Sequence, residues 1–331
     1  MARPSMKEAA DSEAIRTDTG ARKSLRSFVS LFLKIGISAG LIGFLLWTHP
    51  ISLPTLTSDL VVLLLCALAM LLVQPALVGW RWSILLRQLK TNATLRDCII
   101  ITWISIFSNQ FLPSSVGGDV VRLAVGRIRG WHIGPTLISI VLDRGFALLA
   151  MLIVIATTAP LLGGMADRYP LLWFSLGPLA VISVGIIFAR PILRLLSAIL
   201  DKTFLGPHVR RYLESVAAIA SSPWLLAVVT ALAISVHVLS IAAMVLVLRA
   251  FEVDLAFGQL AAASAVVIFA QVMPISIGGW GVREAASVAV FSAIFVQADV
   301  ALSASILMGL TYLIASLPGG VLWLALNRRK P

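Results

Sequence analysis

The chain has 331 residues, of which 59% are hydrophobic and only 12% are charged, and its mean hydropathy is +0.99. Soluble globular domains are not this apolar, so the composition indicates a polytopic membrane protein. The formal net charge of +11 comes mainly from lysines and arginines that cluster beside apolar stretches. Because such clusters set the orientation of membrane proteins, they need no nucleic acid to explain them, and we expect no nucleic-acid partner.

Apolar stretches close to the roughly 20 residues that a bilayer requires predict six full membrane spans. These stretches lie at about 28–47, 60–78, 134–158, 170–189, 223–248 and 300–326. Residues 1–27 are polar and of mixed charge, which is typical of a cytoplasmic tail, and residues 327–331 form a short basic tail on the same side. We therefore expect one membrane domain over residues 28–326.

Two shorter apolar segments, at about 98–111 and 257–273, each end in a copy of one motif. Residues 110–122 read QFLPSSVGGDVVR, and 161 positions later residues 271–283 read QVMPISIGGWGVR. The identities pair Gln110 with Gln271, Pro113 with Pro274, Ser115 with Ser276, Gly117 with Gly278, Gly118 with Gly279, and Arg122 with Arg283. A matched interruption of apolar segments in two halves of a membrane protein indicates a transporter's binding site.

A helix, a proline–glycine break and a short return helix predict a re-entrant hairpin at each motif. The crossings at 134–158, 170–189 and 223–248 separate the hairpins, and because their number is odd, the second hairpin enters from the opposite side. The predicted fold is all-α, with two inverted-topology repeats at about 28–158 and 170–326. Each repeat contains about three transmembrane helices and one re-entrant hairpin. In an alternative topology each motif joins two ordinary spans, which gives eight crossings.

The motif residues suit an anion-binding site. Each proline lacks a backbone donor and the glycine pair permits positive φ, so free N–H groups would gather at the start of the return helix, where the helix dipole favours an anion. The motif serines can add hydroxyl hydrogen bonds, and Arg122 and Arg283 can donate bidentately to a phosphate. The alternative for a single copy is a helix–loop junction whose arginine reaches the membrane interface, but the duplication favours a shared site.

Other ionisable and polar residues complete the predicted binding set, and they differ between the halves. They are Asn109, Asp119, Asp143, Arg144 and Glu284. Asp119 can pair with Arg122 across one helical turn. Asp143 and Arg144 lie within an apolar run, where ionisable side chains are functional candidates, and we expect each to meet a hairpin group such as Arg122 or Glu284. Asn109 can bond to backbone groups that the break leaves free.

No metal site, cofactor or catalytic set is predicted. The two cysteines, Cys66 and Cys98, lie in or beside apolar stretches and are interpreted as small core hydrophobes. The four histidines lack metal-ligand spacing, and no nucleotide-binding or hydrolase motif is present. We therefore expect a protein without enzymatic activity.

The stretch NQFLPSSVGGDVVR, the Asp143–Arg144 pair and the stretch QVMPISIGGWGVRE together resemble a known family. It is the transmembrane, flippase-like domain of the lysylphosphatidylglycerol synthases (the multiple peptide resistance factor family) and their stand-alone bacterial and archaeal relatives. The resemblance runs through nearly the whole chain after residue 25, although many members carry Glu-Arg where this chain has Asp143–Arg144. It implies no aminoacyl transfer, which the synthases place in a separate soluble domain.

The resemblance implies a multi-pass protein of the bacterial inner membrane, with cytoplasmic termini, in which the hairpins face a lipid that moves between leaflets. Membrane lipids, and enzymes of lipid or glycan biosynthesis, are the implied partners. The leading hypothesis is a flippase-like transporter of a phosphate-bearing lipid: a phospholipid, a polyprenyl-linked lipid or a hopanoid-pathway lipid. Two alternatives stay open, namely an ion-coupled small-solute transporter and a non-catalytic membrane partner of a lipid-modifying enzyme.

Overall fold

A computed structural model describes residues 35–52, 54, 57–112, 117–162, 216–217, 219, 221–271, 276 and 278–327. All regular secondary structure in these residues is helical, as the sequence predicts. The expected span at 170–189, the tail at 1–27 and the basic residues after Asn327 lie outside the described residues, as do Pro113, Ser115 and Pro274.

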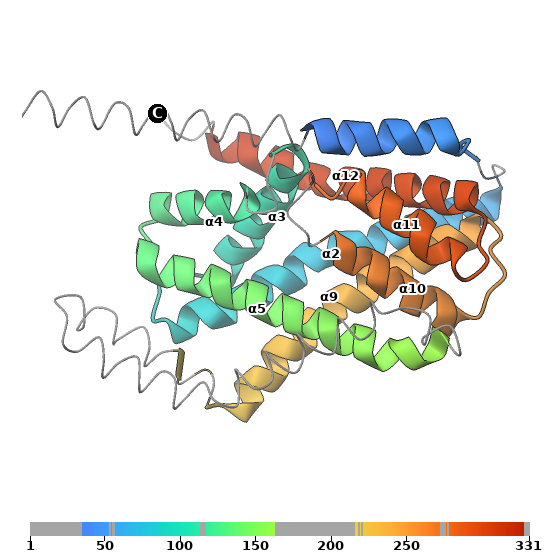
Figure 1. Cartoon of the computed structure of the whole chain (residues 1–331). Helices are drawn as coiled ribbons and strands as arrows, with labels where there is room; N and C mark the ends of the chain where they lie inside the picture. The colour runs from blue at the N-terminus through green and yellow to red at the C-terminus, as the bar shows by residue number, and fades with distance from the viewer. Residues whose placement is uncertain are drawn as a thin grey trace, which may run out of the picture.

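Four long helices form the centre of the described structure: α2 (Ser58–Gln88), α5 (Ile133–Thr158), α9 (Pro223–Ala250) and α12 (Ala298–Asn327). Each is long and apolar enough to cross a membrane, and together they run through the molecule in Figure 1. The start of α2 is fixed by the Thr57 hydroxyl, which accepts a hydrogen bond from the backbone N–H of Leu60, and Ser222 caps α9 in the same way. The predicted span at 60–78 was too short, because α2 continues as one helix to Gln88.

Shorter helices make up the rest of the described chain: Ile35–Thr48, α3 (Leu95–Phe111), α4 (Gly117–Ile128), α10 (Phe257–Ala270) and α11 (Val282–Ser292). The longest of the four motif helices, α3, has 17 residues and so spans about 26 Å, less than the roughly 30 Å hydrocarbon core. Helix α3 packs against α4, and α10 packs against α11. These lengths and contacts agree with two hairpins, and the side from which each enters the membrane stays a prediction.

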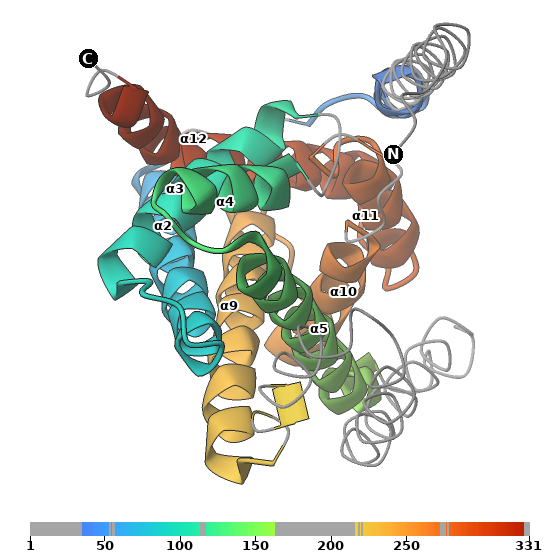
Figure 2. The same ribbon diagram turned by 90° about the vertical axis from the view of Figure 1, so that its left-hand side faces the viewer.

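The helix contacts repeat between the two halves. Helices α2, α3, α4 and α5 of the first half correspond in order to α9, α10, α11 and α12 of the second half. Contacts in one half have counterparts in the other: α2 packs on α3 as α9 packs on α10, and α4 packs on α5 as α11 packs on α12. The contact of α3 with α12 likewise has its counterpart in the contact of α10 with α5. Helices α2 and α9, which exchange with each other, lie side by side at the centre of Figure 2. The repeated motif is therefore accompanied by repeated packing, whereas the inversion of the halves relative to the membrane stays a prediction.

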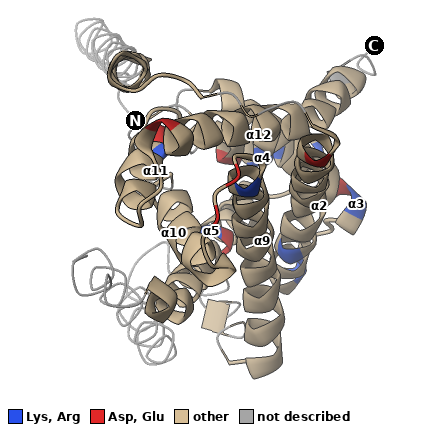
Figure 3. Ribbon diagram, turned by 90° about the vertical axis from the view of Figure 1, so that its right-hand side faces the viewer, with Lys and Arg blue, Asp and Glu red and all other residues tan. Residues whose placement is uncertain are grey.

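Small and aliphatic side chains allow these helices to approach closely. Helix α10 buries Ala261, Ala262, Ala263 and Ala265 in the core that it shares with α2, α5, α9 and α12. Figure 3 shows that long stretches of the helices carry no charged residue. The cysteine prediction was right only for Cys98, which is buried; Cys66 is exposed on α2, on a face that would meet lipid.

Candidate functional site

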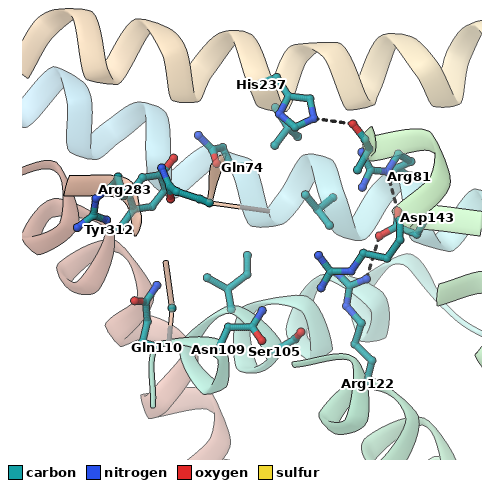
Figure 4. Close-up of a pocket in the computed structure, with 17 residues that line it drawn as sticks. Gln74, Arg81, Ser105, Asn109, Gln110, Arg122, Asp143, His237, Arg283 and Tyr312 are labelled. Atoms are coloured by element: carbon teal, nitrogen blue, oxygen red, sulfur yellow. Dashed lines mark hydrogen bonds and ion pairs between the residues drawn. The ribbon is translucent and has the colours of Figure 1, made fainter. Parts of the chain in front are cut away.

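A polar cavity of about 340 Å³ lies where the two motif copies meet the long helices (Figure 4). The first copy and its preceding residue contribute Asn109, Gln110 and Arg122, and the second copy contributes Gln271, Gly278 and Arg283. The long helices contribute Gln74, Arg81, Asp143, Arg144, His237 and Tyr312. Residues about 160 positions apart in the chain therefore share one cavity.

A carboxylate between two guanidinium groups forms one end of the cavity. Asp143 accepts a hydrogen bond of 2.6 Å from Arg81 Nε and one of 3.0 Å from Arg122 Nη1 (Figure 4). All three side chains are no more than 5% exposed. Buried charges of this kind persist only when they are paired, so the three side chains hold α2, α4 and α5 together. The contact of Asp143 with Arg122 is the one that the sequence predicts.

Arg81 follows the predicted span at 60–78, so the sequence places it among the basic residues that cluster beside apolar stretches, and the structure corrects this. In the structure its residue is 3% exposed and it faces the cavity from within α2. An arginine just beyond an apolar stretch is expected at the membrane–water interface if the helix ends there. Because α2 continues beyond it, Arg81 lies inside the helix and beside Asp143.

One N–H donor of Arg122 has no partner within the described residues. Its guanidinium lies 4.9 Å from the centre of the Trp82 ring, and the Trp82 indole N–H donates to Ser139 Oγ at 2.9 Å, which fixes the ring. In the described part of the chain, Arg122 Nε is buried and has no hydrogen-bond partner. A buried donor without a partner costs about 1–3 kcal/mol, so a ligand oxygen that reached it would be bound favourably.

Asp119 pairs with Arg144 and not, as the sequence suggested, with Arg122. Arg144 donates from Nε at 2.9 Å and from Nη2 at 3.1 Å to the two oxygens of Asp119, a bidentate contact between α5 and α4. The Arg144 side chain is 52% exposed, so this pair is more open than the Asp143 group. The expected meeting of Arg144 with a hairpin residue is thus confirmed, with Asp119 as the partner.

Glycine is required for different reasons in the two motif copies. The backbone N–H of Gly118 donates to Asn109 Oδ1 at 2.7 Å, the contact expected for Asn109, and a Cβ at Gly118 would lie 2.6 Å from the carbonyl oxygen of Ser105. In the first copy glycine therefore permits close helix packing. In the second copy Gly278 and Gly279 have φ of +57° and +83°, values that side chains disfavour.

Arg283 occupies a closed slot beside the second motif. Its guanidinium donates from both Nε and Nη2 to Glu284 Oε1, with the Nε contact at 2.9 Å, and lies 4.6 Å from the centre of the Trp280 ring. Glu284 is fully buried, and its other oxygen accepts from the backbone N–H of Gly281 at 2.6 Å. The backbone of Gly309 packs closely against both the guanidinium and the Trp280 ring. Arg283 is therefore held rigidly, with its charge matched by its neighbour.

Not every predicted residue faces the cavity. Gly117, Gly118, Asp119, Ser276, Gly279 and Glu284 are described but do not line it. Glu284 and Asp119 support cavity arginines from behind, and Ser276 Oγ is buried without a partner in the described part of the chain. Sequence reasoning missed Gln74, Arg81, Ser105, His237 and Tyr312 as lining residues. A polar side chain in the middle of an apolar stretch, as at Gln74, is the signal that could have found some of them.

The model of the family described as Lysylphosphatidylglycerol synthase TM region matches residues 31–319, so the chain belongs to this family. The match includes both motif copies and the helices that surround the cavity, and it confirms the resemblance drawn from the motifs. Comparisons with curated proteins and with solved structures found no match. Family membership and the polar cavity together are the premises for assigning a function.

Proposed function

We propose that this family member is a flippase-like transporter that moves a phosphate-bearing lipid between the leaflets of a bacterial inner membrane, with both termini in the cytoplasm. Its partners are membrane lipids, and it transports without catalysing a reaction. The substrate is a phospholipid, a polyprenyl-linked lipid or a hopanoid-pathway lipid. The family's name refers to the synthase of a phosphatidylglycerol derivative, which supports a lipid over a small solute.

The observation that carries the proposal is an excess of positive charge in a cavity shared by both motifs. Four arginines line it, whereas three acids pair with them within the described residues: Asp143, Asp119 and Glu284. The described groups therefore leave one positive charge unmatched. A phosphodiester carries one negative charge and accepts several hydrogen bonds, so it matches both the excess charge and the unpartnered Nε of Arg122.

The size of the cavity supports a head group as the part of the lipid that enters. A volume of about 340 Å³ is near the lower limit of pockets that hold small molecules, roughly 300–1,000 Å³, and cannot enclose two acyl chains as well. The hydrocarbon chains would stay outside, against exposed apolar residues such as Val62 and Leu65 of α2 and Val321 of α12. This division between a polar interior and an apolar exterior is what moving a polar head group across a bilayer requires.

The ion pairs supply a way to bind and release the head group. A phosphate arriving at Arg122 and Arg81 competes with Asp143 for their N–H donors, so binding and release exchange one set of charge-assisted hydrogen bonds for another. Arg283 contacts the rest of the head group from the other motif, and the Asp119–Arg144 pair closes or opens beside the phosphate. Since the sequence has no nucleotide-binding motif, movement is downhill or coupled to an ion.

The lipid that remains bound during purification tests the proposal. Lipids extracted from the purified protein and identified by mass spectrometry should include a phosphate-bearing lipid that Arg122→Ala loses. Arg127→Ala is the matched control, because Arg127 is exposed on the same helix, and it should retain the lipid. Equal retention by both variants, or a bound lipid without phosphate, would contradict the proposal.

A further inference from the structure

The cavity has two chemically different ends (Figure 4). At the end that we call cationic, Arg81 and Arg122 share the single carboxylate of Asp143. At the end that we call neutral, Arg283 lies near the amide of Gln74, the phenol of Tyr312 and the amide of Gln110. Gln271, whose side chain lies against Gly279 of the second motif, also lines the cavity. The charge of Arg283 is matched by Glu284, so the excess positive charge belongs to the cationic end.

Every acidic group in or behind the lining, among the residues that the structure describes, is already committed to an arginine. Asp143 contacts two of them, Asp119 holds Arg144 with both oxygens, and Glu284 accepts from Arg283 as well as from a backbone N–H. Among the described lining residues Asp143 is the one acid, and it lies at the cationic end. An ammonium group in the head group would therefore meet arginines and no available carboxylate. Like charges placed together across an interface cost several kcal/mol.

The neutral end instead offers groups that suit hydroxyls. The side chains of Gln110 and Gln271 line the cavity and make no hydrogen bond within the described part of the chain. The amide N–H of Gln74 donates to Ser240 Oγ at 3.1 Å, which holds Gln74 in place. An amide offers both a donor and an acceptor, as does the hydroxyl of Tyr312, and a hydroxyl group on a ligand can satisfy either.

On the premise of the proposed function, we infer that the head group attached to the phosphate is uncharged and hydroxylated, as glycerol and sugar head groups are. The phosphate binds at the cationic end, and the hydroxyls bind the amides and the phenol at the neutral end. Aminoacylated and ethanolamine head groups are disfavoured, because their ammonium group has no free carboxylate to pair with. Glycerol and sugar head groups share this chemistry.

Transport of four tail-labelled lipids in liposomes tests the inference. The lipids are phosphatidylglycerol, a sugar phosphate polyprenyl lipid, phosphatidylethanolamine and an aminoacylated phosphatidylglycerol, and the readout is the rate of leaflet exchange. The first two should exchange at least about tenfold faster than the last two, given the size of measured charge-pair couplings. The relative rates of the first two distinguish glycerol from sugar. Equal or faster exchange of the amino lipids overturns the inference and leaves the flippase function standing, whereas no exchange of any lipid overturns both.

A carboxylate added to the neutral end provides a second measurement. Gln110→Glu should lower exchange of phosphatidylglycerol and raise exchange of the aminoacylated lipid, shifting their ratio by about tenfold. Gln88→Glu makes the same change of charge at an exposed position at the end of α2 and should leave the ratio unchanged. If Gln110→Glu also leaves the ratio unchanged, or shifts it in the opposite direction, the neutral end does not select the head group and the inference fails.

Discussion

An alanine at position 309 would place a methyl group against the guanidinium of Arg283. A Cβ there would overlap Arg283 Nη2 and lie 2.7 Å from its Cζ and 2.8 Å from the Trp280 ring. Unstrained carbon contacts are about 3.5–4.0 Å, so the arginine, the tryptophan or α12 must move. Moving Arg283 away from the methyl group would break its contacts with Glu284 and Ser305, and the nearby Trp280 ring would have to move as well.

Whether Gly309→Ala raises or lowers the free energy of unfolding shows which of two opposing effects is larger. Replacing glycine by alanine inside a helix favours folding by about 1 kcal/mol. Losing hydrogen bonds to a buried charged group opposes folding by about 1.5–3 kcal/mol each. For one lost hydrogen bond we therefore expect Gly309→Ala to lower stability by about 0.5–2 kcal/mol, the difference of these two effects. It should also slow lipid exchange, because Arg283 leaves its position at the cavity.

Thermal unfolding of the purified protein and lipid exchange in liposomes measure the two effects. Gly145→Ala is the matched control, because Gly145 is also inside a long helix but a Cβ there would meet nothing within 4 Å. The control should unfold at the same or a higher temperature and exchange lipid normally. If Gly309→Ala were as stable and as active as this control, the slot would not be what positions Arg283, and the reasoning would be refuted.

Two further predictions address the buried charges and the topology. Asp143→Asn leaves Arg81 and Arg122 without their carboxylate and should lower stability by about 3–5 kcal/mol; an unchanged unfolding temperature would show that the group is not structurally coupled. In a cysteine-free background, Ile128→Cys after the first hairpin should be labelled by an impermeant thiol reagent from the cytoplasmic side, and Phe295→Cys after the second from the opposite side. Both positions are exposed, and labelling from the same side would exclude inverted repeats.

The duplicated motif predicted the location of the cavity because its residues interrupt helices, and such interruptions in apolar segments are visible in sequence. Asn109, Gln110, Arg122, Gln271 and Arg283 accordingly line one cavity. The all-helical fold class and the boundaries of α5, α9 and α12 were predictable for a similar reason, since runs of apolar residues mark them, whereas the end of α2 was not.

Which ionised side chains pair with each other was less predictable, because pairing depends on how the helices pack. Asp119 has an arginine one turn away in its own helix, yet it pairs with Arg144 once α4 packs on α5. Arg81 was counted with the basic residues beside the span at 60–78, because the length of α2 was underestimated. Gly309 gives no signal in the sequence, since only the position of the Arg283 side chain reveals why a larger residue would not fit.

The central claim is that the cavity arginines bind a lipid phosphate so that the lipid changes leaflet. The most direct measurement is the rate at which liposomes containing the purified protein exchange a tail-labelled phosphatidylglycerol or polyprenyl phospholipid between leaflets. The wild-type protein should exchange one of these lipids faster than protein-free liposomes do, and the Arg122→Ala/Arg283→Ala double variant, inserted to the same extent, should not. Exchange at the protein-free rate by the wild type, or at the wild-type rate by the double variant, would contradict the account.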